Sequence, residues 1–391
     1  MPKKIAIFED GNGFGGAVFA LLENLRHLSF NKDYEFIIFH SLNDPRFDIF
    51  TEETQCQLKY NPVKNWTLNN KYLDTIFKRF NLYLLINSIN SYCLLHQYKP
   101  DLIYTNNDIE CNLHAIIASK LLKLPIISHE RDVPSFWSKT TKLLYSSISV
   151  LIVISQATKL AVIKQGFPES NIIKIVDGID TQRLIRNSTL IDTSSIKQHY
   201  QLPLDKKIIL MIGMITHWKG QHIALQAVKK IKTERSDLYF VFVGEKPAGD
   251  KTNYLNDLQN YIIENNLQTI ISMLGYSKMI ASLINASNLI IHTSITPEPF
   301  GRVIVESMSL KKPVIATNIG GPCEIINNEK TGYLIEPNNS TVLANKIIEV
   351  INTPEQSKKM ARAAQEYALN HYDSKIVAFK IEKLLHLYTG H

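Results

Sequence analysis

The sequence predicts an α/β protein made of two doubly wound domains in tandem. Short apolar runs rich in β-branched residues alternate with helix-patterned segments along the chain, which is typical of βαβ units and parallel sheets. This alternation stops between residues 180 and 205, where Ser, Thr and Asn are frequent, and restarts at residue 208. A length of 391 residues suits two domains of about 100–200 residues each.

Twelve short apolar runs are expected to form the strands, and each is bounded by turn residues. Because most of the runs are apolar without strict polar alternation, both faces of each sheet should be covered by helices. Helix patterns include residues 17–28 after the first strand and residues 357–388 near the end of the chain. The expected strands are residues 4–8, 35–39, 102–104, 125–128, 150–154, 172–176, 208–212, 239–243, 270–274, 289–292, 313–317 and 332–335.

Composition excludes several classes of protein. The four cysteines lie far apart without a C-x-x-C pair, so neither a disulfide framework nor a zinc site is indicated, and a reducing cytoplasm is expected. The longest strongly apolar stretch, near residues 149–154, is far shorter than the roughly 18–20 residues that cross a bilayer. The net charge of +7 would suit an anionic ligand, nucleic acid or an acidic membrane surface.

A glycine-rich loop, Gly-Asn-Gly-Phe-Gly-Gly at residues 11–16, follows the first strand and precedes a helix pattern. Its spacing matches the G-x-G-x-x-G dinucleotide fingerprint, so an NAD(P)-dependent oxidoreductase is one hypothesis. Glu9 and Asp10 place negative charge before the loop, however, and His40 ends the next strand where a ribose-binding acid would stand. The glycines could instead let backbone approach another ligand at a helix N-terminus, or form a tight turn without a ligand.

The most informative stretch runs from residue 292 to residue 307. A strand ends there, a Pro-containing loop follows, and a helix is expected to start near Gly301, which makes an anion site. Glu298 and Glu306 stand eight positions apart around this helix start, and carboxylates accept hydrogen bonds from vicinal diols. The combination predicts a nucleotide-sugar site, although by itself the pair could be a capping residue and a solvated side chain.

Two further turns at strand ends support the site. Residues 213–220 form a strand-to-helix turn that carries Lys219, and residues 319–324 form another with the paired glycines Gly320 and Gly321. Ligands of doubly wound domains bind beyond the carboxyl ends of the strands. We therefore expect these three loops to face one cleft between the two domains.

At residues 298–306, E-P-F-G-R-V-I-V-E, the sequence resembles the E-x7-E motif of the retaining GT-B glycosyltransferases of family 4, the glycosyl transferases group 1. The similarity continues through residues 311–321 and 331–337. Residues 213–220 resemble the diphosphate loop of that family, and residues 15–17 its N-terminal glycine loop. The resemblance covers nearly the whole chain and is weakest from residue 46 to residue 100.

The resemblance implies a GT-B fold, with two facing Rossmann-like doubly wound domains and an interdomain cleft. Residues 1–185 would form the N-terminal acceptor-binding domain, and residues 200–371 the C-terminal nucleotide-sugar donor-binding domain. The last helix, at about 372–391, would cross back to the first domain.

The resemblance also implies roles for individual residues. Glu306 would bind the ribose, Glu298 the donor sugar hydroxyls and Lys219 the diphosphate, while His129 would lie beside the donor sugar. His129, Glu298 and Lys219 would be the catalytic set. The implied donor-binding residues are Gly15, Gly16, Gly213, Lys219, Glu298, Pro299, Phe300, Gly301, Arg302 and Glu306.

The implied reaction is retaining transfer of a hexose-type sugar from a UDP- or GDP-sugar to a glycan, a lipid-linked or a small-molecule acceptor, as in polysaccharide biosynthesis. No D-x-D motif occurs, so no metal and no cofactor besides the donor substrate are expected. Retention often proceeds through a carboxylate nucleophile. The resemblance places Glu298 at the wrong end of the sugar for attack, which favours front-face substitution.

The sequence departs from the family at two positions. Met214 stands where Arg is usual, and we hypothesise that Arg302 supplies the missing cation, with His217 as a weaker alternative. The missing cation also leaves open a catalytically idle sugar-nucleotide-binding homologue. Asp177 stands where Asn is common, which should affect only the local turn.

Residues 56–100 carry six basic residues and one acid, a local charge of 6 − 1 = +5, interleaved with aromatic residues. Basic-aromatic helices can bind anionic membranes, so a peripheral position on the inner face of the membrane is one interpretation. The other is an amphipathic helical pair with solvated lysines. No nucleic-acid-binding motif accompanies the charge, so nucleic acid is not expected as a partner.

Overall fold

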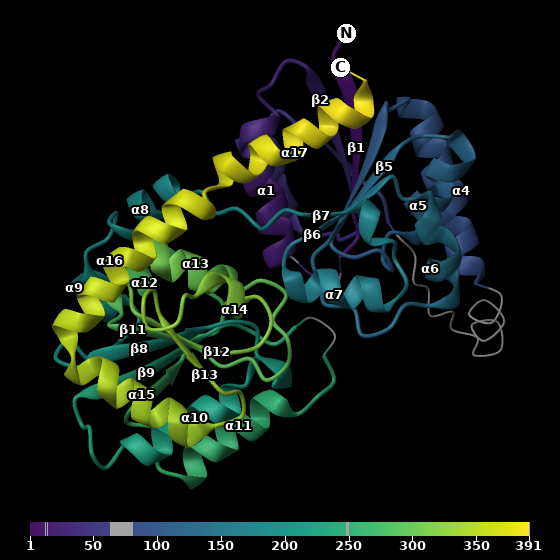
Figure 1. Cartoon of the computed structure of the whole chain (residues 1–391). Coiled ribbons are helices and arrows are strands. Elements are labelled where there is room, and N and C mark those ends of the chain that lie inside the picture. Colours follow the sequence, from purple (N-terminus) through teal and green to yellow (C-terminus); the bar gives the residue numbers. More distant parts are fainter. Residues whose placement is uncertain (12, 14, 63–80, 248–249, 391) are drawn as a thin grey trace. The chain divides into compact units, whose positions relative to one another are not determined.

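The computed structural model describes residues 1–11, 13, 15–62, 81–247 and 250–390. The chain divides into two compact units: unit 1 comprises Met1–Gly178 and Ser374–His391, and unit 2 comprises Ile179–Asp373. Each unit holds one parallel sheet with helices on both faces (Figure 1). This confirms the predicted pair of Rossmann-like α/β domains.

The sheet of unit 1 has the order β3-β2-β1-β4-β5-β6-β7. Its first three strands progress outward from β1, and the chain then returns to place β4 on the other side of β1. The neighbours β1 and β4 therefore form the topological switch point, where ligands of this fold class bind beyond the strand ends. The strands are β1 (Lys3–Glu9), β2 (Tyr34–His40), β3 (Gln57–Tyr60), β4 (Leu102–Asn106), β5 (Ile126–Glu130), β6 (Val150–Val153) and β7 (Ile172–Lys174).

Helices α1 (Gly16–Leu28) and α17 (Ser374–Thr389) cover one face of this sheet and pack against each other. Leu21 and Leu25 of α1 meet Ile5 of β1 and Ile381 of α17 in one apolar core. Burial of each such side chain stabilises the fold by roughly 1.5–3 kcal/mol. The other face carries α4 (Leu82–Tyr98) and α5 (Leu113–Leu122). Shorter helices are α2 (Ile49–Glu53), α6 (Lys139–Leu144) and α7 (Gln156–Lys164).

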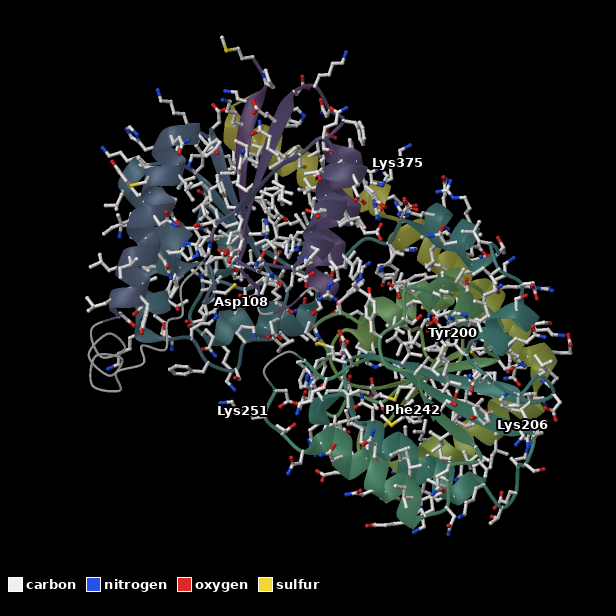
Figure 2. The ribbon with its side chains drawn as sticks, turned by 180° about the vertical axis from the view of Figure 1, so that it is seen from behind. Asp108, Tyr200, Lys206, Phe242, Lys251 and Lys375 are labelled. Carbon is white, nitrogen blue, oxygen red and sulfur yellow. The ribbon has the colours of Figure 1, made fainter. Side chains whose placement is uncertain are left out.

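The sheet of unit 2 has the order β10-β9-β8-β11-β12-β13, so its switch point lies between β8 and β11. Phe242 of β9 lies in the core beneath α10, α11 and α15, whereas Lys251 and Lys375 are exposed (Figure 2). The strands are β8 (Lys207–Ile212), β9 (Leu238–Val243), β10 (Ile271–Met273), β11 (Leu289–His292), β12 (Val314–Thr317) and β13 (Tyr333–Ile335). The helices are α8 (Thr181–Ser188), α9 (Thr193–His199), α10 (Gln221–Ile231), α11 (Tyr254–Glu264), α12 (Ile280–Ala286), α13 (Arg302–Ser309), α14 (Pro322–Ile325), α15 (Ser340–Asn352) and α16 (Pro354–His371).

Each of the twelve expected strands is present, with ends that differ by a few residues. Strand β3 was not expected, because Gln-Leu-Lys-Tyr alternates polar and apolar residues and pairs only with β2 at the sheet edge. The helix pattern at residues 357–388 is two helices, α16 and α17. They are separated near Tyr372 and Asp373, where the chain passes from unit 2 back to unit 1.

Residues 181–199 form helices α8 and α9, which pack against α12 of unit 2. The Asp180 side chain caps α8 by accepting a hydrogen bond from the Arg183 N–H, and Asp192 caps α9 in the same way. Two of the polar residues in the stretch that suggested a linker are therefore helix caps, and most of the others lie within α8 and α9. For this reason the first unit ends at Gly178 and the second begins at Ile179, rather than at the expected residues 185 and 200.

The chain crosses between the units twice, at neighbouring points. Within unit 2, the Ile179 N–H donates to the Tyr372 carbonyl at 2.8 Å. Within unit 1, a Cβ atom on Gly178 would lie 2.6 Å from the Cα of Ser374, which is closer than real Cβ atoms approach backbone. Glycine at position 178 therefore lets the two segments run side by side.

Residues 63–80 lie outside the described residues, and with them four of the six basic residues of the segment 56–100, for which a membrane contact and a helical pair were the two interpretations. The described part of that segment includes α4, whose Leu85 and Ile89 are 55% and 56% exposed one turn apart. Among the described residues, no helix combines the length and apolarity needed to cross a bilayer.

Candidate active site

The clearest cluster of charged side chains in unit 2 lies where β8 and β11 end. Lys219 follows β8 and Glu298 follows β11, so the two loops belong to the switch point of the sheet. The Lys219 Nζ lies 2.9 Å from Oε1 and 2.7 Å from Oε2 of Glu298. These side chains are only 13% and 8% exposed, so the ion pair is largely shielded from water.

Glu298 has two further polar neighbours. The Ser294 hydroxyl donates to Oε2 at 2.7 Å, and the His292 Nε2 lies 3.1 Å from the same oxygen. Burial raises the pKa of Glu298, but the charges of Lys219 and His292 outweigh burial and hold that pKa well below its usual range. Glu298 is therefore an ionised hydrogen-bond acceptor at neutral pH, not a general acid.

Lys219 is held by its own loop. Its Nζ lies 4.2 Å from the centre of the Trp218 ring, a cation–π contact. A Cβ on Gly213 would lie 3.6 Å from the Lys219 Cδ, so the glycine at the end of β8 faces the aliphatic part of this side chain. The Trp218 ring thus supports the ammonium group, whereas Gly213 faces only the aliphatic part of the side chain.

Hydrogen bonds join the two loops. The Thr293 hydroxyl donates toward the carbonyl oxygens of Lys219 and Gly220, each at 3.0 Å, and the Ile295 N–H donates to the Trp218 carbonyl at 2.8 Å. Gly220 has φ +72°, and a Cβ there would lie 2.1 Å from the Thr293 carbonyl oxygen. Only glycine fits at this contact, which fixes Lys219 relative to Glu298.

The glycine turn after β12 supports the loop from the other side. The Gly321 N–H donates to the Glu298 carbonyl at 2.7 Å. A Cβ on Gly320 would lie 2.4 Å from the same oxygen. Phe300 is buried with its ring against Tyr372, while Pro299 is partly exposed.

Helix α13 begins directly after this loop. Gly301 precedes it in a left-handed conformation, with φ +104°. The first N–H groups of a helix have no partners within the helix, and together with the dipole they favour an anion at this end.

Arg302 and Glu306 lie one turn apart on α13, with Nη2 3.7 Å from Oε1. The residue expected to supply a second cation therefore adjoins the carboxylate expected to bind ribose. Met214 is half exposed, and the ring of His217 stacks on His222 at 4.7 Å between centres.

The structure thus brings the predicted residues of unit 2 together in the loops that follow β8 and β11 and in helix α13. They are Gly213, Lys219, Glu298, Pro299, Phe300, Gly301, Arg302 and Glu306. The supporting residues His292, Ser294 and Thr293 were not predicted. Their only signal is a polar His-Thr-Ser run at the end of an apolar strand.

The other three predicted residues belong to unit 1. Gly15 and Gly16 stand at the N-terminus of α1, and a Cβ on Gly15 would meet no atom within 4 Å. His129 lies near the end of β5 and is buried. Burial, with a smaller effect of the Arg131 charge, holds the pKa of His129 well below its ordinary value, so the ring is neutral.

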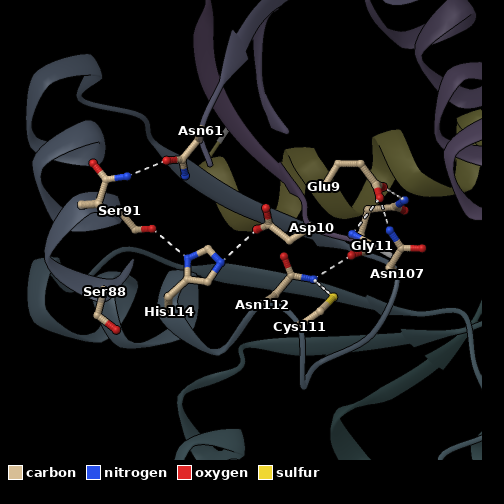
Figure 3. A network of polar contacts seen from close by, with 12 residues as sticks. Glu9, Asp10, Gly11, Asn61, Ser88, Ser91, Asn107, Cys111, Asn112 and His114 are labelled. Atoms are coloured by element: carbon tan, nitrogen blue, oxygen red, sulfur yellow. Dashed lines mark hydrogen bonds and ion pairs between the residues drawn. The ribbon is translucent and has the colours of Figure 1, made fainter. Parts of the chain in front are cut away.

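Buried acids precede the glycine-rich loop of unit 1 (Figure 3). The Asp10 Oδ2 lies 2.9 Å from the His114 Nε2, and the His114 Nδ1 lies 2.7 Å from the Ser91 hydroxyl. Glu9 accepts hydrogen bonds from the side-chain amides of Asn106 and Asn107. The two acids at this strand end are therefore buried and already have partners within unit 1.

Such a strand end is poorly suited to a pyrophosphate. At the end of β2, where a dinucleotide site carries an acid for ribose, the His40 Nδ1 lies 2.9 Å from the Leu42 carbonyl. The contacts around the loop therefore give no support to the dinucleotide hypothesis. Within the described ranges, no group of three or more His, Cys, Asp or Glu side chains is placed to hold a metal ion.

Solved structures match the chain over nearly its whole length and share its two-domain architecture. Anabaena HepE, solved in complex with UDP-glucose, is 25% identical with a TM-score of 0.82, covering 98% of this chain and 99% of that protein. A glycosyltransferase from Rickettsia africae is 24% identical with a TM-score of 0.83, covering 99% and 98%. The chain has the GT-B fold, as predicted.

Residues 192–367 match the family model described as glycosyl transferases group 1. Spore coat protein SA of Bacillus subtilis is 31% identical over 192 residues, which cover 47% of this chain and 48% of that protein. The N-acetyl-alpha-D-glucosaminyl L-malate synthase of Bacillus anthracis is 28% identical over 193 residues, 49% of each chain. The chain spans about half the length of these curated relatives. The match over residues 192–367 confirms the resemblance to the glycosyl transferases group 1 that was seen in the sequence.

Proposed function

We propose that this protein is a glycosyltransferase that moves a sugar from a nucleoside diphosphate sugar to an acceptor hydroxyl. One observation carries the proposal: the Lys219–Glu298 pair stands beside the N-terminus of α13 at the switch point of unit 2. A cation and a helix N-terminus suit a diphosphate, whereas an ionised carboxylate suits sugar hydroxyls. The complex of Anabaena HepE with UDP-glucose supports a UDP-sugar as donor.

In this proposal Lys219 turns from Glu298 toward the diphosphate and neutralises charge as the nucleotide leaves. The acceptor oxygen forms a bond to the anomeric carbon while the bond from that carbon to the β-phosphate oxygen breaks. The acceptor proton passes to the departing phosphate oxygen. Both new and old bonds lie on one face, so the configuration is retained without a metal ion or a carboxylate nucleophile.

The state of Glu298 supports this mechanism. When Lys219 turns to the diphosphate, Ser294 still donates to Oε2 and His292 still lies beside it, so the carboxylate stays partnered and is a poor nucleophile. Its depressed pKa also makes it a poor proton donor. Binding and orienting the donor sugar is the role that remains.

A glycan, lipid-linked or small-molecule acceptor would bind unit 1. Two matched relatives carry names of glycan enzymes: the poly(ribitol-phosphate) alpha-N-acetylglucosaminyltransferase and the capsular polysaccharide biosynthesis glycosyltransferase CapM, both of Staphylococcus aureus. They support polysaccharide biosynthesis as the setting of the reaction.

A panel of thermal-shift measurements tests the donor class. UDP, GDP and their sugars are compared with NAD(P)H, and a UDP or UDP-sugar is expected to raise the unfolding midpoint. A ligand at one hundred times its Kd adds about 2.7 kcal/mol to the folded state. A shift with NAD(P)H alone would contradict the proposal, and binding of a UDP-sugar without transfer or donor hydrolysis would indicate an idle homologue.

Arg302 is expected to replace the cation missing at Met214. Arg302→Ala and Lys219→Ala should each weaken UDP binding by about tenfold, which is 1.4 kcal/mol. Lys358→Ala serves as a control for net charge, because Lys358 is exposed on α16 and pairs only locally with Glu355. Calorimetric titration measures the affinities, and an unchanged Kd in the Arg302 variant rejects this role.

We also propose that unit 1 makes a peripheral contact with an anionic membrane through residues 56–100. The exposed Leu85 and Ile89 of α4 adjoin the basic stretch in sequence, a combination that suits a lipid interface. The chain should sediment with vesicles containing anionic lipid, and Leu85→Ser/Ile89→Ser should weaken this severalfold. Equal sedimentation with neutral vesicles, or none with either, contradicts the contact.

A further inference from the structure

The surroundings of His129 determine which of its ring nitrogens carries the proton. The His129 Nδ1 contacts the Tyr104 hydroxyl and lies 3.2 Å from the Arg131 Nη2. A guanidinium group has only N–H donors and stays charged, so it cannot accept a hydrogen bond. Nδ1 must therefore be the acceptor, which leaves the proton of the neutral ring on Nε2.

Tyr104 alone would not settle the tautomer. A tyrosine hydroxyl can donate to an unprotonated Nδ1 or accept from a protonated one, so it is compatible with either form. Burial raises the pKa of Tyr104, which keeps its hydroxyl protonated and able to do both. Arg131 is the neighbour that excludes one of the two forms.

Arg131 is held so that its guanidinium cannot turn away. Its Nε donates to the Asn106 Oδ1 at 2.8 Å, and its Nη1 donates to the Asp177 Oδ1. The Arg131 N–H donates to the Asn107 carbonyl at 2.6 Å. The Arg131 and Asp177 side chains are 3% and 5% exposed, so the ion pair is deeply buried and costly to open.

The same network explains why residue 177 is an acid. We expected Asp177 in place of Asn to affect only a local turn, but its carboxylate neutralises a buried arginine 46 positions earlier in the chain. An asparagine would leave that charge unbalanced in unit 1. Asn106 extends the network to Glu9 at the end of β1, so the ends of β1, β4 and β5 are linked to the segment that follows β7.

The other ring nitrogen of His129, Nε2, makes no hydrogen bond to the described residues. This nitrogen is buried as well. Buried N–H groups are nearly always paired in native proteins. A neutral donor held at the end of a strand, close to the switch point of the sheet, is the arrangement of a ligand contact.

We propose that Arg131, held by Asp177, is a positioning residue that fixes His129 as its Nε2–H tautomer. Unit 1 then presents a neutral hydrogen-bond donor at the carboxyl edge of its sheet, and the ligand atom it meets is an oxygen with a free lone pair. That this oxygen belongs to a donor sugar rests on the proposed function. The tautomer itself does not depend on that function.

Nuclear magnetic resonance of the full chain labelled with ¹⁵N-histidine tests the tautomer. The spectrum records the ring nitrogens of the 12 histidines. The signal that is missing from the spectrum of His129→Gln is assigned to His129. The expected result is a single form with Nε2 protonated. Tyr104→Phe should keep that form, because Arg131 remains. Arg131→Met/Asp177→Asn, which removes both charges together, should produce the Nδ1–H form or a mixture of the two.

Asp177→Asn alone is the matched control and should keep the Nε2–H form. An Nδ1–H signal in the unaltered chain overturns the inference. The inference is also overturned if Tyr104→Phe changes the tautomer of His129 while the double variant Arg131→Met/Asp177→Asn keeps it. If the double variant does not fold, the tautomer of His129 measured in the unaltered chain and in Tyr104→Phe tests the inference. If the chain shows the Nε2–H form but neither binds nor transfers a nucleotide sugar, the proposed function is rejected. The inference about the tautomer is then unaffected.

Discussion

Replacing Lys219 by Met should lower the free energy of unfolding by about 3–5 kcal/mol, because the change leaves the buried carboxylate of Glu298 without its main counter-charge. Sugar transfer should be lost as well. Adding Glu298→Gln to the same chain removes the stranded charge, so most of the stability should return while activity stays absent. Denaturant unfolding measured alongside a transfer assay separates the two effects.

The pH dependence of this pair has a defined sign. The pKa of Glu298 is depressed in the folded state, so its contribution to stability is present above the ordinary carboxyl value of 4.5 and is lost as the pH falls further. The double variant should lack this acid-sensitive contribution. If Lys219→Met is as stable as the unaltered chain at pH 7, the ion pair does not contribute in the way described.

Replacing Glu9 by Gln should have the opposite pH signature. Burial raises the pKa of Glu9 from 4.5 to about 7, although hydrogen bonds from Asn106 and Gly11 oppose the shift. Between these two pH values the folded chain holds a proton that the unfolded chain has released. The free energy of unfolding therefore falls as the pH rises through this window, by about 3 kcal/mol in total.

Glu9→Gln removes this loss, so at pH 8 the variant should be more stable than the unaltered chain by up to about 3 kcal/mol. Urea unfolding at pH 5, 6, 7 and 8 measures the difference. Glu52→Gln, at an exposed position on α2, is the matched control and should leave the pH profile unchanged. Parallel profiles for the Glu9 variant and the unaltered chain would contradict a raised pKa.

The fold was predictable because both sheets are made of short apolar runs covered on both faces, and such runs are visible in the sequence. The two loops of the candidate active site, residues 213–220 and 298–306, were predictable for a related reason. Each follows a strand and precedes a helix, so each had to lie at the end of a strand. The prediction that failed was the linker, which was inferred from the polar composition of residues 180–205. Asp180 and Asp192 looked like linker residues and are helix caps.

Side-chain pairing could not be predicted in the same way. Lys219 and Glu298 are 79 positions apart, and the sequence of neither loop predicts that the two side chains form an ion pair. Arg131 and Asp177 come from different strand ends, and their pairing depends on how the neighbouring strands align. These contacts arise from tertiary packing and become visible only when the strand order is known.

The double crossing at Gly178 and Ser374 has a consequence for synthesis on the ribosome. Unit 2 is a continuous insertion within unit 1, and α17, which closes the core of unit 1 against α1, is made after the whole of unit 2. Unit 2 should therefore finish folding first, although unit 1 begins to emerge earlier. A released chain that is truncated after residue 373 should protect unit 2 from protease and leave α1 open to cleavage.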